Sequence, residues 1–237
     1  MNVQHELAPT GSLRAGMNLG NTLFTRQDDA GHLQGVSVDL MHELANRLGV
    51  PLELVVYDEP GQVADASSSG TWDVAILAIE KSRAQTLSFS PAMTEIEAGY
   101  IVPHNSALQH ADQVDAKGVT IAAPLKAGYE LYLSGSLKNA SIVRTQNFAH
   151  SLEVFSEHAV CFLAGLKPNL MESLNKLPDS RLLSGNFMTV NHGFAIPRGR
   201  AAADEFLQNF VKDLLASGFV ARSIDKHHIQ GLTALSL

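Results

Sequence analysis

Strand-like and helix-like segments alternate along this chain, and the alternation occurs twice. In the first run, the apolar residues of segment 39–48, such as Leu40 and Leu44, fall on one face of a helix. Gly49 directly follows this segment and is a typical helix stop. The run consists of extended segments at 13–17, 52–56 and 74–77 and helical segments at 39–48 and 61–68. This order is typical of parallel βαβ units, which carry helices on both faces of a sheet.

A second run has extended segments at 119–123, 141–144 and 159–163 and helical segments at 128–137, 148–155 and 169–174. Two such runs predict an α/β fold of two Rossmann-like lobes. One extended segment leads out of the first run near Pro103, and another at 191–197 can lead back, so we expect two strands to cross between the lobes. The predicted domains are 11–102 for lobe 1, 103–192 for lobe 2, and 193–237 for the return to lobe 1 with its C-terminal helices.

The composition argues against several classes of protein. The chain has 237 residues, 45% of them hydrophobic, which suits one large or two modest globular domains. Its formal net charge is -7, so we expect no nucleic-acid partner. Cys161 is the single cysteine and lies in an apolar run, which predicts a buried thiol and no internal disulfide. The histidines lack ligand-like spacing, so the sequence predicts no metal and no cofactor.

The segment from Gly70 to Pro91 most directly suggests a function. A turn of small residues leads into the apolar strand 74–77, and the short polar loop after that strand carries Arg83. Ligands of open α/β sheets bind outside the carboxyl ends of the strands, and a guanidinium there can hold a carboxylate by two parallel hydrogen bonds. The segment therefore predicts a carboxylate site, although a lone arginine in a polar loop is more often solvated or paired with a surface acid.

Several short motifs follow one another in one order along the chain. They are 13–18 near the start, 35–40 at the opening of a helix, 72–74, Arg83 with 89–90, and 218–220 near the end. Their succession resembles that of the family 3 extracellular solute-binding proteins, over nearly the whole chain from Leu13 to His228. The resemblance implies the type II periplasmic-binding-protein fold and the function of an amino-acid receptor for a bacterial ABC importer.

The resemblance also implies roles for residues of the first lobe. Arg83 would clamp the ligand carboxylate, and Glu80 stands where a hydroxyl residue usually assists the arginine. Backbone donors from Ala78 to Glu80 would complete this part of the site, in a loop shorter than the usual pattern. Asn18 replaces an acidic residue that often contacts the ligand amine, and Asn21 replaces an aromatic residue that often stacks on the ligand side chain. Both replacements argue against a standard amino acid as the ligand.

In the second lobe, Lys126, Ala127 and Gly128 replace the usual Gly-Thr-Thr at a helix N-terminus. That helix start still offers N–H groups and a positive dipole end to an anion. Lys126 would add a cationic contact or be solvated, and Tyr129 would face the cleft or cover its own helix. The acidic residue that commonly binds the ligand ammonium falls at Ala164, so the ligand amine needs another partner or is absent. Candidate partners are Glu80, Glu97 and Glu157.

These features predict a protein that binds a small carboxylated solute, such as an amino acid, in a cleft between lobes and presents it to an ABC transporter permease. We expect no enzyme activity, although a dehydratase-like enzyme of this fold would use one of the three glutamates as a general acid on a carboxylated ring. A ligand-sensing module is a further alternative. The resemblance implies a periplasmic location, but residues 1–10 show no secretory leader, so a cytoplasmic location stays open.

Overall fold

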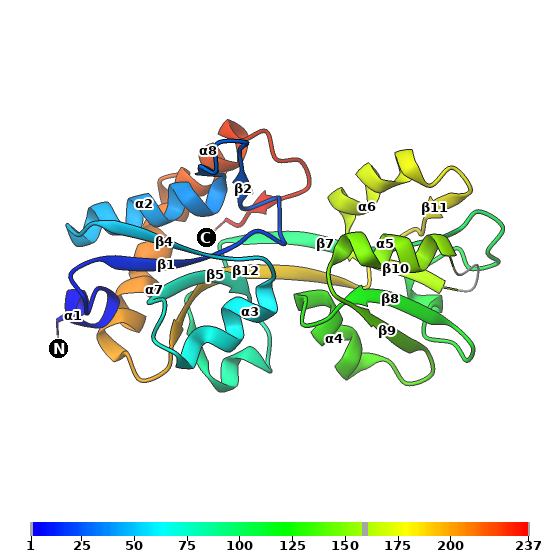
Figure 1. The fold of residues 1–237 in the computed structure, drawn as a ribbon, viewed down its shortest axis with the longest axis horizontal. Coiled ribbons are helices and arrows are strands. Elements are labelled where there is room, and N and C mark those ends of the chain that lie inside the picture. The colour runs from blue at the N-terminus through cyan, green and yellow to red at the C-terminus, as the bar shows by residue number, and fades with distance from the viewer. Residues whose placement is uncertain (1, 158–160, 237) are drawn as a thin grey trace. The chain divides into compact units, whose positions relative to one another are not determined.

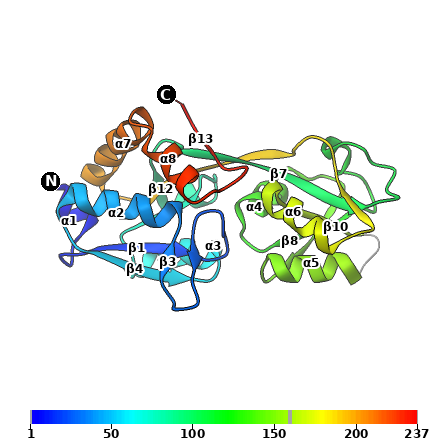
Figure 2. The same ribbon diagram turned by 90° about the horizontal axis from the view of Figure 1, so that it is seen from above.

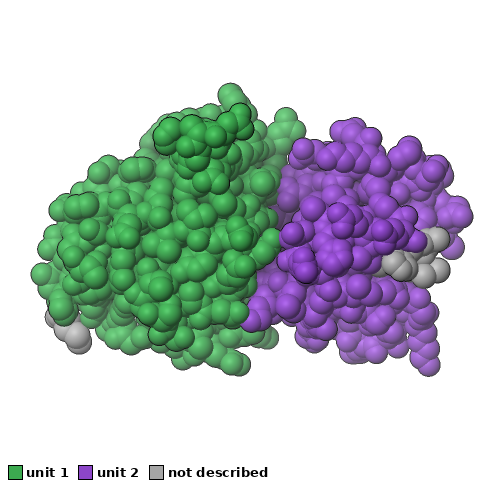
Figure 3. Space-filling view, viewed as in Figure 1, with its two compact units in different colours: residues 1–95, 191–237 green, residues 96–190 purple. Residues whose placement is uncertain are grey.

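The computed structural model describes residues 2–157 and 161–236 of the chain, without the side chain of Cys161. The predicted buried thiol and the start of the strand predicted at 159–163 thus lie outside the described residues. The chain forms two compact units, unit 1 with Met1–Glu95 and Asn191–Leu237 and unit 2 with Ile96–Val190 (Figure 3). It passes from unit 1 to unit 2 within strand β7 (Thr94–Pro103) and returns within strand β12 (Met188–Pro197).

Unit 1 is built on a sheet with the strand order β4–β1–β5–β12. The first three strands are β1 (Leu13–Asn18), β4 (Leu52–Tyr57) and β5 (Val74–Ala78), and β1 runs parallel to both of its neighbours. Strand β12 runs antiparallel to β5. The shorter strands are β2 (Arg26–Gln27), β3 (Leu33–Gln34), β6 (Leu87–Phe89) and β13 (Thr233–Ala234). The carboxyl ends of the three parallel strands therefore lie at one edge of the sheet.

Helices cover both faces of the unit 1 sheet, with α2 on one face and α3 on the other (Figure 1). Helix α8 contacts both α2 and α7 (Figure 2). The helices of unit 1 are α1 (Val3–Leu7), α2 (Val36–Leu48), α3 (Pro60–Asp65), α7 (Ala201–Ala216) and α8 (Phe219–Lys226), with short 3₁₀ turns at Ala66–Ser68 and Arg83–Gln85. Gly49 ends α2 with a φ of 67°, which a glycine adopts without steric cost.

Two helices of unit 1 differ from their predicted bounds. Helix α2 begins at Val36 instead of residue 39, because Val36 and Val38 are buried like the apolar face that follows and Gly35 packs closely on the Phe24 carbonyl. Helix α3 ends at Asp65, and the last residues of the predicted segment 61–68 form a 3₁₀ turn. The periodic pattern thus located both helices, whereas local packing set their ends.

Trp72 occupies the core of unit 1. The indole is completely buried, and its Nε1–H donates a 2.9 Å hydrogen bond to the Val63 carbonyl. A Cβ at Gly16 would lie 3.2 Å from the indole Cγ, so a glycine in β1 lets the tryptophan approach the strand. Trp72 therefore acts as a packing residue.

Unit 2 repeats the alternation of strands and helices. Its strands lie in the order β7–β10–β8–β9, with β10 parallel to β8 and antiparallel to β7, and β11 pairs with β7. The remaining strands are β8 (Thr120–Pro124), β9 (Ser141–Thr145), β10 (Cys161–Leu166) and β11 (Ser180–Leu182). The helices are α4 (Gly128–Ser136), α5 (Phe148–Glu157) and α6 (Lys167–Ser173), with 3₁₀ turns at Ala111–Gln113 and Leu174–Lys176.

The core of unit 2 lies between its sheet and the helices that cover it. Helix α5 contacts β8, β9 and β10, and it crosses in front of the sheet in Figure 1. Ile101, Phe155, Leu163 and Leu170 form a buried cluster that joins β7, α5, β10 and α6. Both units therefore contain sheets with strand–helix–strand connections, which confirms the predicted α/β fold with two Rossmann-like lobes and two crossing strands.

Candidate functional site

In unit 1, the predicted site residues follow the carboxyl ends of neighbouring strands. Asn18 ends β1 and is in register with Tyr57 at the end of β4. Ala78 ends β5 and is paired with His192 of β12. The loops after β1 and β5 carry the other predicted residues of this lobe, which are Asn21, Glu80 and Arg83. The structure thus brings the five predicted residues of lobe 1 to the sheet edge where α/β proteins bind ligands.

Arg83 is held inside this edge. It begins a 3₁₀ turn, is only 5% exposed, and donates a 3.1 Å hydrogen bond from its guanidinium to the Ala78 carbonyl. Burial lowers the pKa of Arg83 to about 10, against the opposing effect of the charges on Glu80 and Asp65. The arginine remains a cation at neutral pH in a poorly hydrated place, where a hydrogen bond to an anion is strong.

Glu80 lies partly buried near this arginine. Burial raises the pKa of the Glu80 carboxyl, and the charge of Arg83 partly offsets the rise. The Glu80 carbonyl accepts the amide of Ala84 at 2.9 Å, which tightens the loop. The side chain therefore supplies an acidic group where the resemblance expects a hydroxyl group.

The two asparagines shape the loop after β1. The Asn18 side-chain oxygen accepts the amide of Gly20 at 3.0 Å, and the Asn21 side-chain oxygen accepts the amide of Leu23 at 3.3 Å. Both bonds span two residues, the pattern by which asparagine stabilises a turn. The structure thus gives each asparagine a turn-forming role, and a contact with ligand stays a prediction for both.

Glu59 was not among the predicted residues, yet it lies at the same edge. It follows the end of β4 and precedes α3, and a Cβ at Gly20 would lie 2.7 Å from its Oε2 atom, so the carboxyl group packs against the loop after β1. Burial and the neighbouring Asp58 raise the pKa of Glu59 to about 7. The acidic pair at 58–59 directly after a strand-like segment was the only sequence signal that could have indicated this residue.

His192 is the side chain of β12 nearest to the end of β5. It is 5% exposed, and its ring packs on Phe24 with 4.6 Å between ring centroids. Phe24 belongs to the loop that starts at Asn21, so this contact joins the crossing strand to that loop.

In unit 2, the predicted residues surround the start of α4. Gly128 is the first residue of the helix, Ala127 is its N-cap, and Lys126 precedes them with a φ of 61°. Tyr129 is 7% exposed, so its ring is largely buried. The loop therefore places a lysine and a helix N-terminus at the carboxyl end of β8, the arrangement expected for binding an anion.

Ala164 lies within β10 and is paired with Tyr100 of β7. It has no exposed surface, and its methyl group offers no polar contact. Ala164 itself therefore supplies no acidic group where the resemblance expects one.

The structure also places the other acids that the sequence suggested. Glu97 forms a 2.6 Å ion pair with the Lys167 ammonium and accepts a 2.9 Å hydrogen bond from the Asn186 amide. Glu157 is exposed at the end of α5.

Among the described residues, no three histidine, cysteine, aspartate or glutamate side chains lie close enough together to hold a metal ion.

A comparison with protein families decides the family of this chain. The pattern of the bacterial extracellular solute-binding proteins, family 3, matches residues 13–230. The chain belongs to this family. No curated protein matches this family 3 solute-binding protein. Among the described helices, none has the length and apolar character needed to cross a membrane.

Solved structures confirm the type II periplasmic-binding-protein fold of this family 3 solute-binding protein. A mutant of ArgBP from T. maritima is similar with a TM-score of 0.77 at 21% identity, over 95% of this chain and 98% of that one. A putative ABC transporter binding component from Wolinella succinogenes DSM 1740, complexed with lysine, has a TM-score of 0.77 at 18% identity, over 92% and 95%. AncCDT-1, an ancestral amino acid-binding protein and precursor of cyclohexadienyl dehydratase, has a TM-score of 0.76 at 22% identity, over 95% and 99%.

Proposed function

We propose that this protein binds a small carboxylated solute, an amino acid or a related compound, between its two lobes and presents it to the permease of an ABC importer. The observation that carries this proposal is the buried arginine at the carboxyl edge of the unit 1 sheet. Arg83 is 5% exposed and its guanidinium lies near the end of β5. Membership of family 3 supports the transport role and a periplasmic location.

Binding would occur in two steps. The ligand carboxylate first docks on Arg83 and on backbone donors between Ala78 and Glu80. The second lobe then contributes the loop from Lys126 to Tyr129 and the strand around Ala164. Closure of the lobes is favoured only by the amount by which the closed form binds the solute more tightly than the open form.

For the ligand amine, unit 1 offers Glu80 and Glu59. Glu97 already pairs with Lys167, and Glu157 is exposed at the end of a helix, so neither is placed as well. A positive group on the ligand would offset the burial that raises the pKa of both unit 1 acids. The lysine complex of the Wolinella relative fits a ligand that carries such a group. We therefore propose a cationic or zwitterionic amino acid as the first ligand class to test.

The test replaces Arg83. In Arg83→Ala, affinity for a bound amino acid should fall by about 2 kcal/mol or more, the scale of a lost charge-assisted contact, as measured by calorimetry. Arg83→Lys keeps the charge and guards against misfolding, and it should also weaken binding because it lacks the planar fork. Arg47→Ala is the matched control, since Arg47 pairs with Glu43 and Asp213 on the surface of the same unit. Undiminished affinity in both folded Arg83 variants would remove Arg83 from the site.

A dehydratase-like activity is the second candidate. The observation that favours it is the burial of Glu80, which raises the pKa of that carboxyl in the direction that suits a general acid. One relative is described as a precursor of cyclohexadienyl dehydratase. Loss of water from a carboxylated cyclohexadienol, followed by absorbance and abolished in Glu80→Gln, would establish an enzyme. Binding of the same compound without turnover would support the receptor.

A further inference from the structure

We propose that Glu130 is a positioning residue, which holds the loop before α4 in the shape that presents Lys126 and the helix N-terminus to an anionic group of the ligand. The inference rests on the proposed function, because it concerns the half of that site contributed by unit 2. It goes further by assigning a role to Glu130 and Arg144.

The loop has a backbone conformation that needs a restraint. Lys126 has a φ of 61°, and in the described part of the chain His228 is the only other non-glycine residue with a positive φ. A residue with a Cβ is disfavoured in this region and stays there only when its surroundings fix it. Neighbouring groups must therefore hold the backbone of Lys126 in this conformation.

Glu130 provides the restraint. Its Oε2 atom accepts the backbone N–H of Lys126 at 2.9 Å, from a position in the first turn of α4. Two backbone bonds act with it, from the Leu125 amide to the Thr145 carbonyl at 2.9 Å and from the Ala127 amide to the Pro124 carbonyl at 3.2 Å. The N–H of Lys126 is thus used inside the loop, and this bond fixes the backbone from which the Lys126 side chain extends.

The charge of Glu130 would work against an anionic ligand if nothing balanced it. Glu130 is 2% exposed, and its Oε1 atom accepts bonds from the Arg144 Nε at 2.8 Å and from the Ser134 hydroxyl at 2.6 Å. The other end of the Arg144 guanidinium donates to the Ser134 hydroxyl at 2.8 Å. Arg144 therefore neutralises the carboxylate, so that the positive end of the helix remains attractive to an anion.

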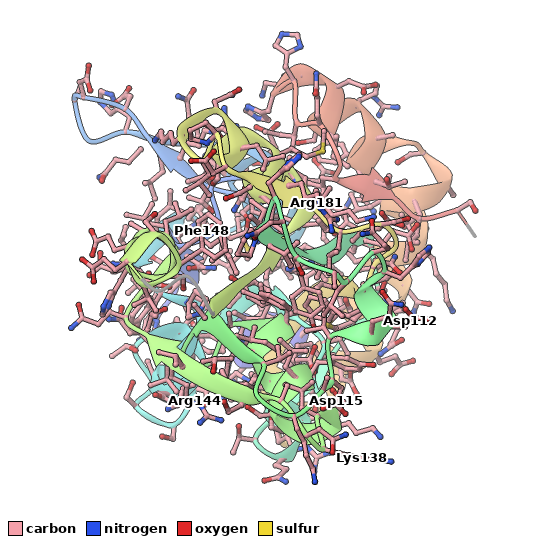
Figure 4. The ribbon with its side chains drawn as sticks, turned by 90° about the vertical axis from the view of Figure 1, so that its right-hand side faces the viewer. Asp112, Asp115, Lys138, Arg144, Phe148 and Arg181 are labelled. Atoms are coloured by element: carbon pink, nitrogen blue, oxygen red, sulfur yellow. The ribbon has the colours of Figure 1, made fainter. Side chains whose placement is uncertain are left out.

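A second carboxylate in unit 2 offers a matched control. Asp115 accepts the backbone amides of Lys138, Asn139 and Ala140, after the other end of α4. It restrains a loop through the same kind of bond as Glu130, and it lies beside Lys138 and apart from Arg144 in Figure 4. Loss of either carboxylate should lower the thermal stability of the protein, whereas only loss of Glu130 should change ligand binding.

The experiment combines amide exchange with binding. In Glu130→Ala, the Lys126 amide should exchange roughly tenfold faster or more, because it loses its acceptor. Glu130→Gln keeps an acceptor oxygen and should restore much of the protection. In Asp115→Ala, the amides of Asn139 and Ala140 should exchange faster while that of Lys126 should not.

The binding probe is the amino acid that stabilises the unaltered protein most in a thermal-shift screen of the standard amino acids. Its affinity should fall roughly tenfold in Glu130→Ala, recover in part in Glu130→Gln, and remain unchanged in Asp115→Ala. Unchanged affinity in Glu130→Ala, or an equal loss in Asp115→Ala, would overturn the inference. If no amino acid binds the unaltered protein, the proposed amino-acid ligand is wrong, while the exchange rate of the Lys126 amide still decides whether Glu130 holds the loop.

Discussion

Two buried carboxylates, one in each unit, are paired with arginine at opposite ends of their sheets. In unit 1, Asp73 has no exposed surface and forms two 2.9 Å bonds with the Arg14 guanidinium, and Arg200 donates a 3.1 Å bond to the Asp73 carbonyl. In unit 2, Glu130 accepts from Arg144. Asp73 precedes β5 and Arg14 lies near the start of β1, so the first pair lies at the amino ends of the strands. Glu130 follows β8 and lies at a carboxyl end.

We expect the role of each buried ion pair to depend on the end of the strands at which it lies. Both pairs combine one buried carboxylate with an arginine and with a backbone N–H, although Arg14 donates two bonds to Asp73 whereas Arg144 donates one to Glu130 and one to Ser134. Ligands bind outside the carboxyl ends of strands in open α/β sheets. The Asp73 pair should therefore contribute to stability alone, whereas the Glu130 pair should also affect binding.

The largest expected effect follows from removing Asp73. Asp73→Ala leaves Arg14 and Arg200 without their shared acceptor, and their side chains are only 18% and 21% exposed. The free energy of unfolding should fall by about 3 kcal/mol, measured by urea denaturation. Asp213→Ala removes a 67% exposed partner of Arg47 and should cost less than about 1 kcal/mol. A loss of ligand affinity in the folded Asp73 variant would contradict the assignment of this pair to stability alone.

Removal of an arginine gives the next effect. Arg144→Gln leaves Glu130 buried with the Ser134 hydroxyl and the Lys126 amide as its donors. Because Arg144 is 49% exposed, the free energy of unfolding should fall by only about 1 kcal/mol. Affinity for the ligand should fall as well, since the carboxylate near the helix start is no longer neutralised and repels the anionic group of the ligand. Calorimetry that finds the Arg14→Gln and Arg144→Gln variants equal in affinity would break the comparison.

Much of the fold was predictable because its signals are local. The apolar face of α2 and the glycine after it placed that helix, and the apolar run before Ala78 placed β5. The position of Arg83 was predictable from the same strand. A residue that directly follows a parallel strand in the sequence must lie near the carboxyl end of that strand. The burial of Arg83 and its nearness to Asp65 were not predictable. Asp65 ends helix α3, and only the tertiary fold brings this helix close to the loop that carries Arg83.

Contacts between distant residues account for the remaining differences. The Nε2 atom of His227 lies 2.9 Å from the Asp39 carboxylate, and the His227 side chain is 16% exposed. Asp39 lies in the first turn of α2. It also accepts bonds from Ser223 and Lys226, which fasten α8 to α2 and lower the pKa of the Asp39 carboxyl. No pattern within either helix indicates such a pairing.

The smallest effect tests Glu59, a partly buried carboxyl group whose pKa is raised by burial and by a neighbouring acid. Burial and Asp58 raise the pKa of Glu59 to about 7, so between about pH 4.5 and pH 7 the folded protein binds a proton that the unfolded chain does not. Stability must then fall as the pH rises through this window, because the folded state has to carry a poorly solvated charge. Glu59→Gln carries no such charge and should be more stable than the unaltered protein at pH 8 by roughly 1 kcal/mol, a value reduced because the group is partly solvated.

The gain from Glu59→Gln should vanish near pH 4, which urea denaturation at several pH values would measure without any ligand. Asp58→Asn is the control for the neighbouring charge. It removes the smaller cause of the shift and should reproduce only part of the gain. A stability difference between Glu59→Gln and the unaltered protein that is independent of pH would show that the pKa of Glu59 is the same in the folded protein as in the unfolded chain. In that case Glu59 would resemble Asp73 and Glu130 in having its charge balanced within the fold, although it is only partly buried.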